Sequence, residues 1–236
     1  GCEPDLSYGA SFSSGTYALH EAHTELLLPL LCATGRFFAH GPDGTGTGML
    51  TMDAGEPWLF FLELVRDSDA QYRLAGVLRR KDETMDLGQP IMMLPAGWVF
   101  TKEHLAPLRH SGAFSWIVAL RQTGPITIPA AEAETFIQKL FASPRLPPTT
   151  LPPELAPEQR ATAPLRKLLV RPHPVEPHEV CARIAFSYGG QDFSETDPRP
   201  GALDWPQRVF HPRDYAAERT AAQTLQTLGF RRRANY

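Results

Sequence analysis

The sequence lacks the features that mark secreted and membrane-spanning proteins. It has only three cysteines, Cys2, Cys32 and Cys181, and an odd, widely spaced set of this kind implies no disulfide framework. The longest apolar run, residues 26–33, is interrupted by Pro29 and falls far short of the roughly 20 residues that cross a bilayer. No basic segment precedes this run as it would in a signal peptide. We therefore expect a cytoplasmic protein without a membrane partner.

A strong charge of either sign is also absent. The 236 residues carry a formal net charge of −3, and 21% of them are charged. This balance argues against a basic surface that grips nucleic acid over the whole molecule. The hydrophobic share of 42% is sufficient for a core, and the length allows one large domain or two small ones.

Phosphate-binding and nucleophile motifs are missing as well. The glycine-rich residues 41–48 are followed by Met49 and Leu50, whereas a P-loop ends on a lysine followed by serine or threonine. The pattern after these glycines is not that of a helix, which a dinucleotide fingerprint would open. No Gly-x-Ser-x-Gly elbow occurs. We interpret residues 41–48 as a loop and expect no catalytic or cofactor-binding residue in this chain.

Two short spacings bring candidate metal ligands close together. His20 and His23 would share one face of a helix, and His178 stands three residues before Cys181. Neither pair has a partner pair at a typical zinc spacing. His178 and Cys181 also fall at the start of an expected strand, where residues three apart point to opposite faces. We therefore expect surface histidines and a buried cysteine, and no metal site.

Three apolar runs between residues 56 and 100 predict the central sheet. Residues 56–65 and 72–80 are rich in aromatic and branched side chains and flank the polar residues 66–69, which is typical of an antiparallel hairpin. Residues 91–100 predict a third strand. Both faces of the first strand are apolar, which predicts cover on both sides. The second strand alternates apolar and polar residues, which predicts a half-exposed strand.

Further helices and strands are expected before and after these runs. Residues 115–121 fit either a helix or a strand, and we favour the helix. The other predicted helices are residues 25–33, 102–108 after a Thr101 cap, 130–141, and 215–228 between an Asp214 cap and Gly229. The other predicted strands are residues 36–39, 126–128, 167–171, 179–188, 191–193 and 208–210, with Gly189 and Gly190 in a hairpin turn. The fold class that follows is α+β, an antiparallel sheet core with flanking helices.

Proline is abundant, with 23 residues, about twice the average share. Seven of these prolines fall within residues 144–164, where they favour an extended, stiff segment that cannot occupy a central strand. We interpret this segment as a linker between two lobes. The expected domains are an N-terminal α+β lobe of residues 1–143 and a second, smaller α+β lobe of residues 165–236.

Basic residues are concentrated in short clusters that are candidate contacts to DNA phosphates. Together they could form a stripe whose binding would depend on salt and tolerate many sequences. On a chain of this net charge, most such residues are expected to lie on solvated surfaces. The candidates are Arg79, Arg80, Lys81, Arg166, Lys167, Arg171, Arg231, Arg232 and Arg233.

A set of short fragments, in a fixed order along the chain, resembles a known family. The fragments are residues 29–36 (PLLCATGR), 57–60 (PWLF), 78–80 (LRR), 126–129 (ITIP), 151–155 (LPPEL) and 182–189 (ARIAFSYG), followed by Arg213, Asp214 and Glu218. Their order resembles that of the N-terminal accessory region of bacterial Swi/Snf-family helicases, the DNA-dependent ATPases of helicase superfamily two. The similarity spans most of the chain.

The resemblance implies an auxiliary, non-catalytic segment ahead of two motor lobes that bind ATP, magnesium and duplex DNA. The chain has neither the family's Gly-Lys-Thr loop nor its Asp-Glu-x-His segment, so no catalytic residue of the family is carried to any position here. ATP and magnesium are expected only in the motor lobes of the parent protein. The implied role is regulation, guidance of DNA, or docking of a partner to the motor.

Two other interpretations stay open. In one, the chain is a free-standing protein that binds another protein through the proline-rich segment or an exposed strand edge. In the other, it is a hydrolase whose catalytic groups meet only in space, because Ser/His/Asp and Cys/His centres are assembled from distant residues. A deep pocket that holds a perturbed acid, base or metal would favour the hydrolase.

Overall fold

The fold is that of a computed structural model, which describes residues 18–41, 44, 46, 48–173, 176 and 178–231. It combines helices with mostly antiparallel sheets, so the α+β class expected from the sequence is confirmed. The described residues form two compact units: residues up to 57 with 90–108, and residues 58–89 with 109 onward. Within this part of the chain, no helix is long and apolar enough to cross a membrane.

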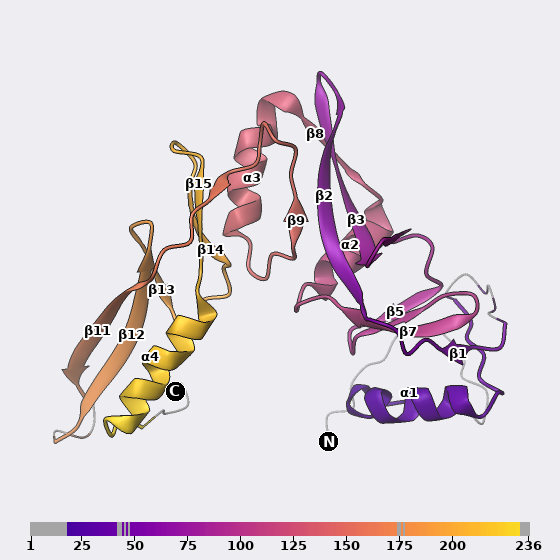
Figure 1. The fold of residues 1–236 in the computed structure, drawn as a ribbon, viewed down its shortest axis with the longest axis horizontal. Helices are drawn as coiled ribbons and strands as arrows, with labels where there is room; N and C mark the ends of the chain where they lie inside the picture. The colour runs from indigo at the N-terminus through magenta and orange to yellow at the C-terminus, as the bar shows by residue number, and fades with distance from the viewer. Residues whose placement is uncertain are drawn as a thin grey trace, which may run out of the picture. The chain divides into compact units, whose positions relative to one another are not determined.

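The first unit contains a helix and a small sheet (Figure 1). Its elements are η1 (Glu21–His23), α1 (Thr24–Ala33), β1 (Thr51–Met52), β5 (Met92–Leu94), β6 (Trp98–Phe100) and β7 (His104–Arg109). Strand β6 is antiparallel to both β5 and β7, and β1 runs parallel to β7. Leu28 and Cys32 of α1 share one hydrophobic cluster with Leu50, Phe100 and Leu105.

Helix α1 confirms the prediction for residues 25–33 and contains Pro29 in its interior. Its buried residues are Thr24, Leu28 and Cys32, which lie four residues apart and therefore form one stripe along the helix. Gly35 follows with a φ of 64°, the left-handed conformation in which many helices end.

The prediction of a helix over residues 102–108 is wrong. Thr101 accepts a hydrogen bond from the backbone N–H of His104 at 3.0 Å, but the chain then continues as strand β7. Leu105 and Ala106 are buried there and pair with β6. Tertiary pairing has therefore overridden a local pattern that suits a helix.

Two other regions of this unit also differ from expectation. Residues 36–39 do not form a strand, and only an isolated bridge joins His40 to Gly46. Residues 91–100 form the two strands β5 and β6 in place of one. Gly97 makes the turn between them with a φ of 88°, a conformation that favours glycine. Half of the glycine-rich residues 41–48, namely 42, 43, 45 and 47, lie outside the described residues.

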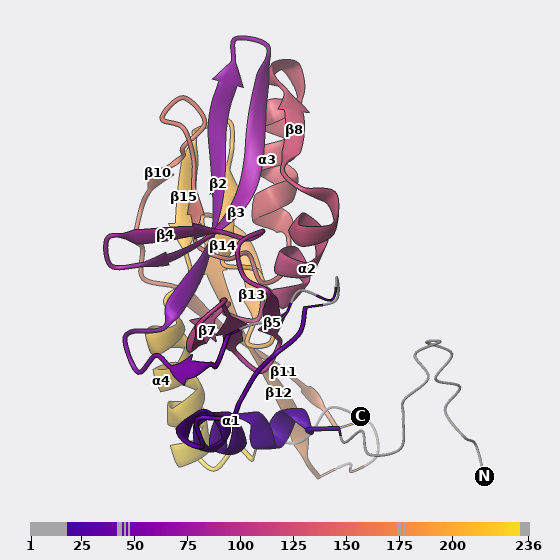
Figure 2. The ribbon, with the colours of Figure 1, turned by 90° about the vertical axis from the view of Figure 1, so that its right-hand side faces the viewer.

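The second unit begins with the long antiparallel hairpin of β2 (Trp58–Ser68) and β3 (Gln71–Arg80), which confirms the predicted hairpin. Strands β4 (Glu83–Asp86) and β8 (Ile126–Pro129) pair antiparallel with β3, and β9 (Thr149–Thr150) pairs parallel with β2. Figure 2 shows the tall β2–β3 hairpin with β8 beside it.

Strand β2 is covered on one face only. Trp58, Phe60, Leu62 and Leu64 are buried on that face. Leu59 and Val65 on the opposite face are exposed, so the prediction of cover on both sides is wrong. The cross-strand neighbours of Leu59 and Val65 are Arg79 and Arg73, and arginine stems can lie over apolar side chains without a second layer of structure.

Helices α2 (Phe114–Thr123) and α3 (Ala133–Ala142) confirm the helices predicted at residues 115–121 and 130–141. A 3-10 turn, η2 (Ala130–Glu132), precedes α3. The buried residues of α3 are Ala133, Ile137 and Leu140, at the spacings of three and four that place side chains on one helix face.

Two three-stranded sheets and a last helix complete the second unit. One sheet has the order β10 (Glu158–Gln159), β15 (Val209–Pro212), β14 (Gly201–Asp204), and the other β11 (Leu165–Pro172), β12 (Val180–Tyr188), β13 (Gln191–Ser194). Phe186, Tyr188 and Phe193 cluster with Ala202 of β14 and Ala221 of α4 (Tyr215–Thr227). The Asp214 carboxylate caps α4 by accepting a hydrogen bond from the backbone N–H of Ala217, as predicted.

The proline-rich residues 144–164 contain two short paired strands. Within this segment, β9 pairs with β2 and β10 pairs with β15, and the side chain of Leu155 is buried. The boundaries of the two compact units are not those of the expected lobes 1–143 and 165–236. The division at residues 144–164 therefore stays a prediction from the sequence.

Candidate functional site

The basic residues of β3 are engaged with neighbours on the same sheet. Arg79 forms an ion pair with Glu63, and its guanidinium lies 5.2 Å from the ring centre of Phe61. Arg80 lies 3.0 Å from the carboxylate of Glu83 and 4.7 Å from the ring centre of Trp58. Each of these guanidinium groups already interacts with a carboxylate and an aromatic ring, so its attraction to a phosphate is weaker.

The other predicted phosphate contacts lie on several elements. Lys81 follows β3 in the turn to β4, with a φ of 50°. Arg231 is exposed at the end of the described chain, while Arg232 and Arg233 lie outside the described residues. The remaining three cations, Arg166, Lys167 and Arg171, all belong to β11. The structure thus places two groups of candidates on strands of different sheets.

Lys167 of β11 reaches across β12 to Asp192 of β13. Its ammonium nitrogen donates to both carboxylate oxygens of Asp192, at 2.7 and 2.8 Å. This hydrogen bond to Lys167 is the main cause that holds the pKa of Asp192 below its usual value. Arg166 and Arg171 are exposed, and neither forms an ion pair with any residue in the described part of the chain.

The β11–β12 hairpin exposes an unusual amount of apolar surface. Leu165 is 65% exposed, Leu169 58%, Val170 56% and Val180 61%, and Leu168 is exposed as well. Strand β11 has no buried residue, and its pairing with β12 runs over eight positions, from Leu165 opposite Ser187 to Pro172 opposite Val180. Apolar side chains gathered on one exposed hairpin are typical of a surface that contacts another molecule.

The strongest polar cluster of the second unit is buried and centred on Arg213. The Nε and Nη2 atoms of Arg213 donate to the two carboxylate oxygens of Glu218, at 2.9 and 2.6 Å. Its remaining N–H groups donate to the backbone oxygens of Ser194, Asp197 and Arg199. All five donors of the guanidinium are therefore satisfied.

Tyr188 extends this network to helix α4. Its hydroxyl donates to Glu218 at 2.9 Å and accepts from the backbone N–H of Asp214 at 2.9 Å. Burial and the bond to Glu218 raise the pKa of Tyr188 to about 12, although the Asp214 N–H opposes the shift. Burial alone would lower the pKa of Arg213, but the hydrogen bond to Glu218 and the charge of that carboxylate raise it.

The side chains of this cluster are hydrogen-bonded to one another and connect α4 to the chain before it. The carboxylate of Asp197 is held by Arg199, whose hydrogen bond lowers the pKa of Asp197. A general base needs a free lone pair directed at a substrate, whereas the groups that form the Arg213–Glu218 network point at one another. Sequence reasoning missed the network, although Arg213, Asp214 and Glu218 stood among the fragments of the family resemblance.

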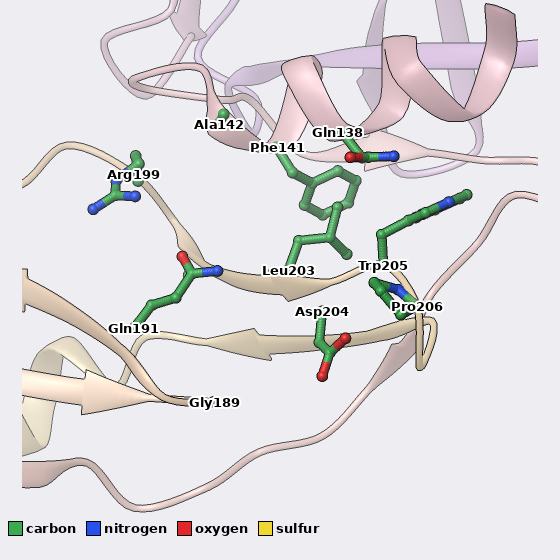
Figure 3. Close-up of a pocket in the computed structure, with 11 residues that line it drawn as sticks. Gln138, Phe141, Ala142, Gly189, Gln191, Arg199, Leu203, Asp204, Trp205 and Pro206 are labelled. Carbon is green, nitrogen blue, oxygen red and sulfur yellow. The ribbon is translucent and has the colours of Figure 1, made fainter.

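An open depression of about 360 Å³ lies between α3 and the β14 region (Figure 3). Phe141 and Leu203 line its middle, with Gln138 and Trp205 on one side of the view and Gln191 on the other. Arg199 contributes to the lining, but its guanidinium is paired with Asp197 at 2.7 Å. The lining combines amides and apolar carbons with one further carboxylate, that of Asp204, and among the described residues that line it there is no histidine, serine or cysteine to act with that carboxylate.

The candidate metal ligands do not converge. The rings of His20 and His23 are 6.0 Å apart, and His178 lies in the turn before β12. Among the residues that the structure describes, no group of three or more His, Cys, Asp or Glu side chains could hold a metal ion. Cys32 is buried and Cys181 partly buried, and both are free thiols.

In comparisons with known proteins, no family model matches the chain, and no curated protein and no solved structure matches it at a significant level.

Proposed function

We propose that this chain is a non-catalytic docking module that holds another protein through the exposed β11–β12 hairpin. The parent we propose is a bacterial Swi/Snf-type DNA helicase, in which the chain would act as an accessory or regulatory segment for motor lobes that bind ATP and magnesium. The compartment we propose is the cytoplasm, and the free thiols of Cys32 and Cys181 are compatible with it.

The observation that carries the proposal is the apolar surface of the hairpin. Leu168, Val170 and Val180 lie on one face of the hairpin and Leu165 and Leu169 on the other, and all five are exposed. Because each side chain is already partly buried, covering the rest of it against a partner would contribute about 1–2 kcal/mol. The described clusters of titratable residues, by contrast, consist of groups that satisfy each other.

The experiment that tests the proposal is a deletion in the longer gene product. The parent protein is purified with and without residues 1–236, and DNA-stimulated ATP hydrolysis, DNA affinity and partner capture are compared. We expect the deletion to leave basal ATP hydrolysis in place and to change DNA stimulation or partner capture. Equal values for both proteins in all three measurements would refute the docking function, and a reading frame without motor motifs would refute the helicase parent.

DNA guidance is a second candidate, because Arg166 and Arg171 are exposed cations without a described acidic partner. Binding through such contacts would weaken steeply with salt and tolerate any sequence. Fluorescence anisotropy with a labelled duplex at several salt concentrations tests this role. Reversal of both charges, in an Arg166→Glu/Arg171→Glu protein, is expected to lower both the affinity and the salt slope.

A further inference from the structure

Strand β11 is the edge of its sheet. One side pairs with β12 along its whole length, and in the described part of the chain no strand pairs with the other side. Alternate residues of an edge strand direct their N–H and C=O groups outward, where an extended segment can add to the sheet by backbone hydrogen bonds. The unpaired edge of β11 thus allows a specific mode of binding, the addition of a strand, which exposed apolar side chains alone would not define.

The side chains along this edge define a pattern for whatever pairs with it. In chain order, β11 presents an apolar residue at Leu165, two cations at Arg166 and Lys167, three apolar residues at 168–170, and a cation at Arg171. Residues directly opposite in a β-ladder lie on the same face and contact each other, and opposite charges there are favourable. A matching segment would therefore place acidic residues opposite the cations and apolar residues opposite the leucines and valine.

The charge of the β11–β12 hairpin favours one kind of binding partner over others. Strands β11 and β12 contain four cations, Arg166, Lys167, Arg171 and Arg183, and no acidic residue, although the chain as a whole has a net charge of −3. Asp192 on β13 offsets only Lys167. A second copy of β11 would add further cations to the same edge, whereas an acidic segment would complement them.

From this edge and its charges we infer that β11 binds an extended, acidic and apolar segment of another protein as an additional antiparallel strand. The sheet it joins is antiparallel throughout, which favours that direction. Read in its own chain direction, the segment has one acidic residue, three apolar residues, two acidic residues and one apolar residue. This inference rests on the proposed docking function, and it specifies the chemistry and binding mode of the partner.

The probe is a synthetic peptide with that pattern, acetyl-Glu-Val-Ile-Val-Glu-Glu-Val-amide carrying a fluorophore. A second peptide has lysine at the three glutamate positions. Two further peptides keep the glutamates and carry backbone N-methyl groups on odd or on even residues, which removes N–H donors from one edge of the added strand only. Binding to the intact chain is measured by anisotropy, and the contact residues are mapped from amide chemical shifts.

We expect the glutamate peptide to bind with shifts centred on residues 165–171, and the lysine peptide to bind at least about tenfold more weakly. One N-methylated peptide should bind like the parent and the other should lose binding, because only one of its edges faces β11. Equal binding of both N-methylated peptides would overturn the edge-pairing mode, and equal binding of the lysine peptide would overturn the charge selection.

Matched variants separate the edge from general electrostatics. Arg166→Glu/Arg171→Glu should lower affinity for the glutamate peptide at least about tenfold, while Arg36→Glu/Arg109→Glu, with the same change in net charge at exposed positions elsewhere, should preserve it. Similar losses in both variants would contradict the inference. If sedimentation shows self-association through β11, the edge binds a second copy of the chain. If a duplex oligonucleotide displaces the peptide, the edge binds DNA.

Failure of the inference can be told apart from failure of the docking function. If the glutamate peptide does not bind while deletion of residues 1–236 abolishes partner capture by the parent, docking stands and the acidic strand is wrong; the cations then only protect the edge from aggregation. If the peptide binds at β11 but the deletion changes nothing, the edge can bind such a strand and the proposed docking function is wrong.

Discussion

Arg213 and Glu218 form a two-bond ion pair in which both side chains are buried. The guanidinium side chain is 0% exposed and the carboxylate side chain 4% exposed, and the pair joins the loop before α4 to the first turn of that helix. The backbone oxygens of Ser194 at the end of β13, and of Asp197 and Arg199 in the chain that leads to β14, accept the remaining hydrogen bonds of the guanidinium. One side chain therefore connects α4 with the ends of two sheets.

Replacement of Glu218 by glutamine should destabilise the protein strongly. The substitution leaves a buried guanidinium without a counter-charge, and removing one partner of a buried pair costs about 3–5 kcal/mol. Urea denaturation followed by circular dichroism measures the change. Asp69→Asn is the matched control, because the Arg66–Asp69 pair is exposed on both sides and should contribute less than about 1 kcal/mol. Comparable losses in the two variants would show that Arg213 gains little from Glu218.

Tyr188 should make stability fall in alkaline solution. Its pKa is raised to about 12 in the folded protein from an unperturbed value of about 10, so the folded state retains the phenol proton after the unfolded chain has lost it. Its contribution is complete below pH 10 and is lost as pH rises toward 12. Tyr188→Phe should be less stable than the unmodified protein at pH 8, and its stability should fall less steeply between about pH 10 and 12.

Denaturation midpoints at half-unit steps of pH test this prediction. The pKa of Tyr72 is also raised, by burial and by Glu154, so the Phe variant should lose only part of the alkaline slope. Parallel curves for the two proteins over this range would mean that Tyr188 does not hold its proton more tightly in the folded state.

Gly76 should not tolerate a side chain. A Cβ there would lie 2.5 Å from Leu87 Cδ1 and 2.9 Å from the ring of Phe60, closer than carbon atoms can approach. We expect Gly76→Ala to cost about 1–3 kcal/mol through overpacking. Gly88→Ala is the control, since nothing lies within 4 Å of its Cβ, and it should change stability by less than about 0.5 kcal/mol. Thermal unfolding of the two proteins would separate them, and an unchanged midpoint for Gly76→Ala would contradict the packing around β3.

The two described cysteines should react with thiol reagents at very different rates. Cys32 is buried against the first unit's core, and this burial raises its pKa, so that little thiolate is present at pH 8. Cys181 is partly exposed and should be modified first. Alkylation for graded times in a Cys2→Ser background, followed by peptide mass spectrometry, measures the order. Faster modification of Cys32 would contradict the packing of α1.

The elements that could be predicted from the sequence are those whose signals are local. The β2–β3 hairpin has a polar turn between long apolar strands, and α4 has a capping aspartate and a closing glycine. Strands β4 and β14 were not predicted, and β7 was predicted as a helix. They are short, and partner strands determine their conformation more than their own composition does.

The candidate site was less accessible to sequence reasoning. The cations of β3 and β11 were identified, but their partners Glu63, Glu83 and Asp192 come from neighbouring strands. Pairing across strands depends on register, which composition does not determine. The exposure of Leu165, Leu169 and Val170 was also out of reach, because an apolar run in a sequence normally predicts a buried strand.

The first unit is built from two separated stretches, residues up to 57 and residues 90–108. The cluster of Leu28 and Cys32 can form only after Phe100 and Leu105 have been synthesised. The β2–β3 hairpin between them in the sequence can pair without these residues. On the ribosome, at about 5–20 residues per second, the leucine-rich helix α1 is therefore synthesised several seconds before its sheet. During that interval helix α1 of a newly made chain needs to be covered by chaperones more than the β2–β3 hairpin that follows it does.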